Sequence, residues 1–295
     1  MVDRGWLITH KNCLDGSTAA LIAQNSGLTP IFVEPDRALE AIREIPNEAA
    51  VYLADVSLRP EEYALVNPRI TKILDHHQSA LGISHHDKVA IDMGKSGSHL
   101  FYDFACGQHW IFPSAPWERL IGAVECYDLW RPCREPGQNL NRLFQSLGHS
   151  WYQNRFAGGW TFYTPDEQTL LADLIFQETQ YREEQLAHAV KVPVPFPIVA
   201  IPLTREGPTN EMAHYLLSQD MALVILLKPD GRISARSDGR INTAELMERL
   251  FHGGGHARAA GGRLDYPGPY DSSHAQAVLE RVSQDLQLNL VAFSE

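Results

Sequence analysis

The chain has 295 residues but only four cysteines, and they are not spaced as pairs. The four are Cys13, Cys106, Cys126 and Cys133, and no two of them form a Cys-x-x-Cys motif. Neither a structural zinc knuckle nor a disulfide framework is therefore expected. Because unpaired thiols are typical of compartments that keep cysteine reduced, the sequence predicts a cytoplasmic protein.

Long hydrophobic runs are missing as well. The longest is Met221–Leu227, which has the length of a strand and is far shorter than the roughly 20 residues that a bilayer span needs. The first ten residues include an acid, Asp3, and only a short apolar stretch, so they do not predict a signal peptide. We expect no membrane partner.

The sequence also lacks an excess of positive charge. It has 25 Lys and Arg against 36 Asp and Glu, a formal net charge of −11. Proteins that bind long duplexes need a basic face, so tight binding of long nucleic acid is not expected. A short polyphosphorylated substrate stays open, because metal ions and a few arginines can supply positive charge locally.

The order of predicted elements indicates an α/β protein with two domains, as the length also suggests at about 100–200 residues per domain. In the first part, continuous apolar runs alternate with helical segments, which indicates a parallel sheet with helices on both faces. The strands are predicted at 6–9, 31–33, 49–54, 70–74 and 89–91.

We place the first domain at 1–150 and a smaller mixed α/β domain at 197–295. Between them, 151–196 is predicted as a helical connector and linker. Its end overlaps the proline-rich segment Val192–Pro197, which cannot continue a helix.

Polar residues follow three of the predicted strands. His10 follows the first strand, Asp55 follows the third, and Asp75-His76-His77 follows the fourth. The carboxyl ends of parallel strands meet at one edge, where ligands bind. Three consecutive metal-competent side chains are hard to explain as structure, because burying them unpaired is costly. For Asp55 alone, a structural cap for the next element is the more ordinary explanation.

Two further segments carry acids that can join this edge. The segment His10–Gly16 (HKNCLDG) forms a strand-to-helix turn, and its Asp15 begins a helix whose N-terminus favours anions. By itself, Asp15 is also explained as a helix cap. Asp128 stands between aromatic residues at a predicted helix end. It is a candidate metal ligand only because the other acids are present.

The predicted second domain contains a glycine-rich segment, His252–Gly262 (HGGGHARAAGG). So many glycines indicate backbone that approaches a ligand closely, and exposed amides there can bind a phosphate. His256 and Arg258 can add charge-assisted hydrogen bonds. Arg236 and Ser237, on the preceding strand, can face the same segment.

These motifs together resemble the DHH phosphoesterases that have a C-terminal DHH-associated domain. The anchors of the resemblance extend over nearly the whole chain. The family fold implies a parallel-sheet domain with two divalent metals, often manganese, and a smaller domain that closes a cleft and holds the substrate. The anchors are THKNCLDG (9–16), AD (54–55), DHH (75–77), YD (127–128) and GGGHARAAGG (253–262).

The resemblance also implies roles for individual residues. Asp55 would bridge both metals and take part in catalysis, and His77 would contact the scissile phosphate or orient a metal ligand. His10 would belong to one metal. The other metal would be completed by Asp15, His76 and Asp128. The substrate would be held by Arg236, Ser237, Gly253, Gly254, Gly255, His256 and Arg258.

One position departs from the family pattern. The first motif usually reads Asp-x-Asp, and here Cys13 stands where the first aspartate would be. A thiolate is softer than a carboxylate and favours zinc or iron. We therefore predict two divalent ions, with Mn²⁺ first and Zn²⁺, Fe²⁺ or Co²⁺ open; alternatively, Cys13 does not bind and its metal is held weakly.

The predicted function is hydrolysis of phosphoester bonds, with water activated by two metals. The expected substrate is a short single-stranded oligonucleotide or a small phosphorylated nucleotide. Hydrolysis of polyphosphate or pyrophosphate is the alternative, and a non-catalytic nucleotide-binding module is a third. The polarity of attack and a homodimeric state stay open.

Overall fold

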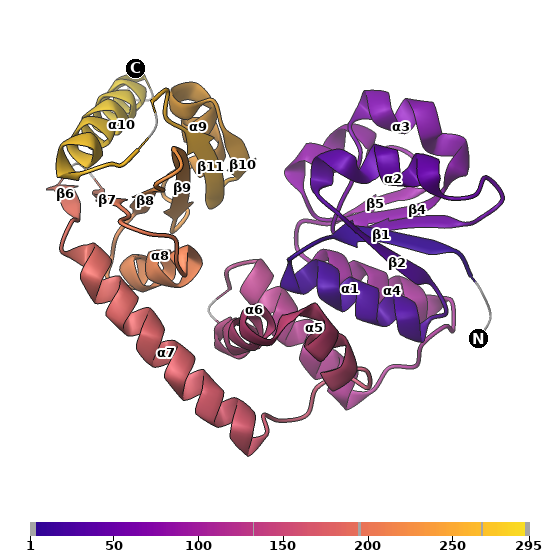
Figure 1. Cartoon of the computed structure of the whole chain (residues 1–295). Coiled ribbons are helices and arrows are strands. Elements are labelled where there is room, and N and C mark those ends of the chain that lie inside the picture. Colours follow the sequence, from indigo (N-terminus) through magenta and orange to yellow (C-terminus); the bar gives the residue numbers. More distant parts are fainter. Residues whose placement is uncertain (1–3, 132, 194–195, 267, 293–295) are drawn as a thin grey trace. The chain divides into compact units, whose positions relative to one another are not determined.

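The computed structural model describes residues 4–131, 133–193, 196–266 and 268–292. The chain divides into two compact units, Met1–Leu171 and Ala172–Glu295, which are coloured indigo to magenta and red to yellow in Figure 1. The division falls inside a helix, within the predicted connector 151–196. No helix among the described residues is long and apolar enough to cross a membrane.

The first unit contains a five-stranded sheet in the order β2-β1-β3-β4-β5, and all its neighbouring strands are parallel. The middle strands are short apolar runs that are buried on both faces, as the sequence predicts. The strands are β1 (Trp6–His10), β2 (Thr29–Val33), β3 (Val51–Ala54), β4 (Ile70–Asp75) and β5 (Val89–Ile91).

Helices cover both faces of this sheet, as predicted (Figure 1). One face packs against α1 (Leu14–Asn25) and α4 (Gly97–Gly107), in a core that also takes in α5 (Ala115–Asp128) and α6 (Glu135–Arg155). The other face packs against α2 (Ala38–Glu44) and α3 (Pro60–Val66).

Two long helices follow the sheet. Helix α6 is broken at Gly148, whose φ of 82° and ψ of 173° are not helical. Helix α7 (Pro165–Leu186) then leads into the second unit, where Tyr181 packs against α8 (Thr209–Ser218).

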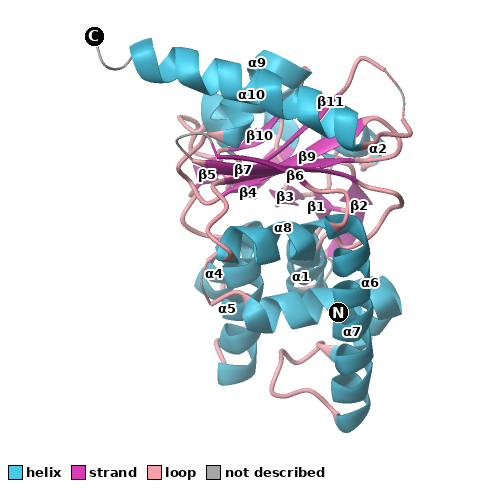
Figure 2. Cartoon of the chain, turned by 90° about the vertical axis from the view of Figure 1, so that its left-hand side faces the viewer, coloured by secondary structure: helices cyan, strands magenta, loops and turns pink. Residues whose placement is uncertain are grey.

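The second unit contains a six-stranded mixed sheet in the order β10-β11-β9-β8-β7-β6. Helix α9 (Thr243–Phe251) and helix α10 (Ser272–Ala292) cover one face, and α8 covers the other (Figure 2). The strands are β6 (Val190–Pro193), β7 (Pro197–Pro202), β8 (Leu223–Leu227), β9 (Arg232–Ser237), β10 (Gly254–His256) and β11 (Ala259–Arg263).

The prediction that Val192–Pro197 is only a linker is wrong. Its first two residues belong to β6, which pairs with β7 in an antiparallel ladder. Prolines remove ladder donors, but they are tolerated on edge strands, and β6 is at the edge of the sheet. Residues 194–195 are outside the described part of the chain.

Candidate metal centre

Three neighbouring strands end with the polar residues that the sequence singled out. His10 is the last residue of β1, Asp55 follows β3, and Asp75 ends β4. Since β3 pairs in parallel with both β1 and β4, the three ends lie at the same edge of the sheet. His76 and His77 continue the chain from there.

Two glycines let other segments approach this edge closely. A Cβ on Gly16 would lie 2.2 Å from the His10 carbonyl oxygen, and one on Gly97 would lie 2.6 Å from the Asp55 nitrogen. Asp55 itself has a φ of 59°, which is uncommon for a residue with a side chain. Helices α1 and α4 can therefore begin directly against the strand ends.

The structure brings all six predicted metal ligands together, in two groups. The ligand atoms of His10, Cys13 and Asp55 lie within 4.8 Å of one another, and so do those of Asp15, His76 and Asp128. Asp55 is linked to the second group as well, because its Oδ1 is 3.3 Å from Nε2 of His76.

Asp15 and Asp55 are buried, and Asp128, whose side chain is 22% exposed, lies close to them. Burial, with the nearby charge of Asp15, raises the pKa of Asp55 well above its usual value. The same causes raise the pKa of Asp128 to about 8. Burial and the charges of Asp55, Asp128 and Asp15 also raise the pKa of the Cys13 thiol. Without a cation nearby, the carboxyls of Asp55 and Asp128 therefore stay protonated at a higher pH than ordinary carboxyls do.

The same groups have the chemistry of a cation site. Among the described residues, no group donates a hydrogen bond to the buried Oδ2 atoms of Asp55 and Asp128. Nδ1 of His10 lies 3.9 Å from the first, and Nε2 of His76 lies 3.5 Å from the second. A further positive partner would stabilise these buried oxygens. Carboxylate oxygens, imidazole nitrogens and a thiolate together suit first-row divalent metals. The residues therefore fit bound divalent cations, and Asp55 lies beside both groups.

Asp75 orients both histidines of the motif. Its Oδ1 accepts a hydrogen bond from the backbone N–H of His76, and it is 2.7 Å from Nδ1 of His77. Burial alone would lower the pKa of His77, but this hydrogen bond and the charges of Asp75 and Asp55 raise it overall. The pair favours a protonated His77 beside an ionised Asp75.

Ser98 holds Asp15 in place, and the sequence analysis missed it. Its backbone N–H donates to both carboxylate oxygens of Asp15, at 3.2 and 3.1 Å, and its hydroxyl donates to Oδ1. Gly97 precedes it and allows the close approach to Asp55. The pair of small residues at the start of α4 was the available signal.

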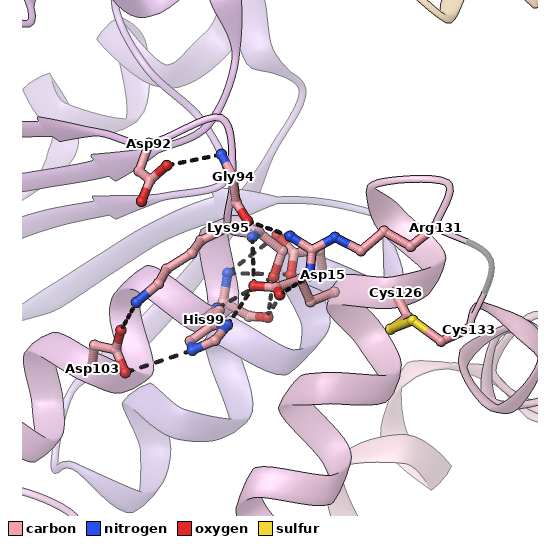
Figure 3. A network of polar contacts seen from close by, with 12 residues as sticks. Asp15, Asp92, Gly94, Lys95, His99, Asp103, Cys126, Arg131 and Cys133 are labelled. Carbon is pink, nitrogen blue, oxygen red and sulfur yellow. Dashed lines mark hydrogen bonds and ion pairs between the residues drawn. A yellow bond between two sulfur atoms is a disulfide. The ribbon is translucent and has the colours of Figure 1, made fainter. Parts of the chain in front are cut away.

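A second layer of contacts supports Ser98 (Figure 3). Glu125 in α5 is buried, and it accepts hydrogen bonds from the Arg131 guanidinium and from the backbone N–H of Ser96. It also bonds Nδ1 of His99, and Arg131 reaches the carbonyl oxygen of Gly94. These contacts fasten the segment before α4 to the helix that ends at Asp128.

Cys126 and Cys133 form a disulfide, so the expectation that the cysteines stay unpaired is wrong for these two. Cys126 is in the last turns of α5, and the chain turns back before α6, so their Cα atoms are 5.6 Å apart. Spacing alone does not show this reversal. Disulfides are typical of oxidising compartments, so the cysteines no longer favour a reducing one. Cys13 and Cys106 are free thiols.

The glycine-rich segment is a β-hairpin and not an open loop. Gly254 and Gly255 lie in β10 and pair with β11. A hollow of about 450 Å³ lies beside the hairpin. Of the predicted substrate residues, Arg236, Gly254 and Gly255 line it.

Three polar residues of β9 face this hollow. Arg232, Ser234 and Arg236 alternate with buried residues, because successive side chains of a strand point to opposite faces. Lys228 lines the hollow too. This alternation is visible in the sequence, but of the three residues only Arg236 is predicted there as a substrate residue.

The remaining predicted substrate residues do not line the hollow. Ser237 is on the buried face of β9, and its hydroxyl donates to the Ile241 carbonyl oxygen. Arg258 is exposed and packs against Gly239. His256 ends β10, and its carbonyl oxygen accepts a hydrogen bond from Thr243. Gly253 approaches Gly261 so closely that a Cβ would lie 1.9 Å from the Gly261 carbonyl oxygen.

Comparison with protein families finds one match, in the second unit. Residues 199–287 match the DHHA1 domain. This segment runs from β7 into α10 and includes the hairpin and the hollow. No curated protein sequence matches the chain significantly.

Solved structures resemble the whole chain at low sequence identity. The pGpG-specific phosphodiesterase PggH from Vibrio cholerae has 16% identity and a TM-score of 0.64, with 96% of this chain and 99% of that chain covered. An exopolyphosphatase-related protein from Bacteroides fragilis has 14% identity and a TM-score of 0.60, with coverage of 98% and 94%.

The third structure is RecJ from Thermus thermophilus, solved in complex with Mn²⁺. It has 16% identity and a TM-score of 0.55, and the match covers 95% of this chain but 52% of RecJ. The fold, the DHHA1 match and the Asp75-His76-His77 motif agree with the resemblance found in the sequence. Residues 199–287 are a DHHA1 domain, and the chain as a whole has the fold of these solved structures.

Proposed function

We propose that the chain is a metal-dependent phosphoesterase that hydrolyses short oligonucleotides or small phosphorylated nucleotides. The observation that carries the proposal is the pair of ligand groups that are linked by the contact between Asp55 and His76. Two-metal sites are typical of phosphatases and nucleases. The neighbours of similar fold include a phosphodiesterase and a Mn²⁺-bound RecJ, which agrees with this assignment.

Each group of side chains has a proposed part in this reaction. His10, Cys13 and Asp55 hold one ion, and Asp15, Asp55, His76 and Asp128 hold the other. When bound, such ions supply an activated water and offset the negative charge on a phosphoryl group. Because Cys13 replaces a hard ligand by a soft one, we propose that Zn²⁺ or Fe²⁺ competes with Mn²⁺ for the first position.

His77 is proposed to assist at the phosphoryl group. Its ring is held by the buried Asp75 through the 2.7 Å contact at Nδ1, and its side chain is 30% exposed. A protonated imidazole in this position can donate a hydrogen bond to a phosphoryl oxygen and a proton to the leaving oxygen. Asp75 fixes the orientation of the ring and does not touch the substrate.

The hollow of the second unit is proposed to bind a phosphate group of the substrate. Three cationic side chains (Lys228, Arg232 and Arg236) and the glycine hairpin line it. Arginine binds phosphate through two parallel hydrogen bonds, and glycine lets the backbone approach the ligand. The substrate therefore has an anionic group in addition to the scissile phosphate.

The direct test is hydrolysis of a 5′-labelled five-nucleotide RNA with Mn²⁺, with Zn²⁺ and without metal. We expect stepwise shortening that needs metal and that falls about a thousandfold in His76→Ala, which corresponds to several kcal/mol of charge stabilisation. His85→Ala is the matched control, because His85 is exposed and outside both ligand groups.

Hydrolysis without metal, or a His76→Ala variant as active as the His85→Ala control, would contradict the proposal. Pyrophosphate and polyphosphate are tested in the same assay, because one neighbour of similar fold is exopolyphosphatase-related. Release of orthophosphate from these, with the RNA left intact, would favour the phosphoanhydride alternative.

A further inference from the structure

A second hollow lies in the first unit, next to the candidate metal ligands. Its volume is about 370 Å³, at the lower end of the range for small-molecule sites. Two of its lining residues, Lys11 and Asn12, come directly between the proposed ligands His10 and Cys13. The full lining is Lys11, Asn12, Phe32, Phe144, Gln145, Gly148 and His149.

The wall of this hollow is aromatic. Phe32 and His149 meet edge to face, with ring centroids 4.4 Å apart and an interplanar angle of 74°. Phe144 adds a third ring from the core side. Burial lowers the pKa of His149, so its imidazole is neutral near pH 7. Rings of this kind stack on nucleobases of any sequence.

The position of His149 depends on the break in α6. Gly148 has a φ of 82°, which only glycine adopts without strain, and such breaks redirect the helix that follows. His149 is therefore the first residue after the redirected turn, and its ring meets Phe32 of β2. The broken helix and the edge strand form the two sides of the hollow.

The mouth of the hollow carries amide groups. Asn12 and Gln145 are both exposed, and each offers two donors and an acceptor. These groups match the hydrogen-bonding edges of an unpaired base. The single cation, Lys11, already lies 3.1 Å from Glu34. One cation and three rings do not suit a polyphosphate chain, which needs several positive charges.

We propose that this hollow binds the nucleobase of the nucleotide whose phosphate lies at the metal ligands. The inference rests on the proposed function and narrows it, because it selects nucleotide substrates over polyphosphate. The base stacks against the aromatic wall, and Asn12 and Gln145 contact its edge. Since aromatic stacking does not depend on the base, we expect only a modest preference between purines.

The test compares ligands that differ only in the base. The dissociation constants of AMP, GMP and ribose 5-phosphate are measured by calorimetry with Mn²⁺, for wild type, His149→Ala and Gln145→Ala. We expect AMP and GMP to bind about tenfold tighter than ribose 5-phosphate to the wild type. In His149→Ala this advantage falls below about threefold, while ribose 5-phosphate binds as before.

Ser150→Ala is the matched control, because Ser150 is exposed, follows His149 in α6 and, unlike His149, does not line this hollow. Gln145→Ala checks the amide contact without disturbing the core. Equal binding of AMP and ribose 5-phosphate to the wild type would overturn the base site and leave the proposed function standing. If none of the three ligands binds and no RNA is cleaved, the proposed function fails, and the base site fails with it.

Discussion

In the candidate metal centre Asp15 and Asp55 are buried next to other acids, whereas the basic groups in the hollow of the second unit already have acidic or amide partners. Within the described part of the chain, no group donates a hydrogen bond to Oδ2 of Asp55 or of Asp128. In contrast, Arg232 pairs with Asp230 and Glu206, and Arg236 donates to Asn210 at 2.8 Å. The carboxylates of the first region therefore need a cation to offset their charge, whereas the arginines of the second region already have protein partners.

This difference predicts that the two regions respond to different perturbations. Metal binding at the metal centre should depend strongly on pH, because protons and metal ions compete for the same carboxylates. Removing one cationic side chain from the hollow should weaken substrate binding and leave metal binding unchanged. Each experiment below separates these two responses.

The largest expected effect is the pH dependence of metal binding. Burial and nearby charge hold the pKa of Asp128 at about 8, so a cation must displace a proton from the metal-free centre below that pH. We expect the affinity for Mn²⁺ to rise about a hundredfold from pH 6 to pH 8, about tenfold for each pH unit. Calorimetry in buffers of different ionisation enthalpy measures the released proton.

The same shifts predict how the metal-free protein responds to pH. A carboxyl whose pKa is raised in the folded state binds more protons when folded, so stability falls as pH rises from the unfolded pKa of 3.8 towards 8. The melting temperature of the metal-free protein should therefore fall as the pH rises, and bound Mn²⁺ should abolish this fall. An affinity that does not change between pH 6 and pH 8 would show that these carboxyls are not ligands.

The second effect is expected in the hollow. Arg236→Gln removes a charge-assisted hydrogen bond, worth about 2 kcal/mol, so KM for the RNA should rise about thirtyfold with kcat unchanged. Mn²⁺ affinity should not change. Arg240→Gln is the control, because Arg240 pairs with Asp238 outside the hollow. If Arg236→Gln lowers kcat or Mn²⁺ affinity, the two regions are not separate in the way proposed.

A smaller effect is expected from Ser98→Ala. The variant keeps the backbone donor to Asp15 but loses the hydroxyl donor. Groups that orient a metal ligand typically contribute 10- to 100-fold to affinity, and here we expect about tenfold for one of the two ions. Ser98→Thr should restore it, and Ser84→Ala, at an exposed site, should be neutral. Equal loss in both alanine variants would contradict a positioning role.

The smallest functional effect is expected from Cys133→Ser. Opening a short disulfide loop should lower the free energy of unfolding by about 2 kcal/mol, as measured in urea. Because Asp128 is held in α5, Mn²⁺ affinity should change less than threefold. Cys106→Ser, at a free cysteine, is the control. A tenfold loss of Mn²⁺ affinity in Cys133→Ser would mean that the disulfide also supports the metal centre.

The strand ends show how much the sequence could predict. His10, Asp55 and His76 each follow a continuous apolar run, and a parallel sheet brings such ends to one edge. Ser98 could not be predicted in this way, because its contact with Asp15 joins residues 83 positions apart. The same holds for Cys126 and Cys133, which meet only because the chain turns back between two helices.

The second unit shows a different limit. The glycine-rich segment was recognised, but glycine content does not distinguish a loop from a hairpin whose strands pack too closely for side chains. Gly253 and Gly255 each approach the facing strand within 3 Å of where a Cβ would stand. The alternation of Arg232, Ser234 and Arg236 is visible in the sequence, but only the structure shows that β9 pairs with the hairpin strand β11.

The number of bound metal ions tests the central claim most directly. Mn²⁺ is titrated into the metal-free protein at pH 8, and the bound ions are counted by calorimetry and elemental analysis for wild type, Cys13→Ala and Asp55→Asn. Asp87→Asn is the control, at an exposed acid outside both ligand groups. The account predicts two ions in the wild type and the control, one in Cys13→Ala, and severe loss of both in Asp55→Asn. Two ions held with unchanged affinity in Asp55→Asn, or fewer than two in the wild type with every metal tried, would contradict it.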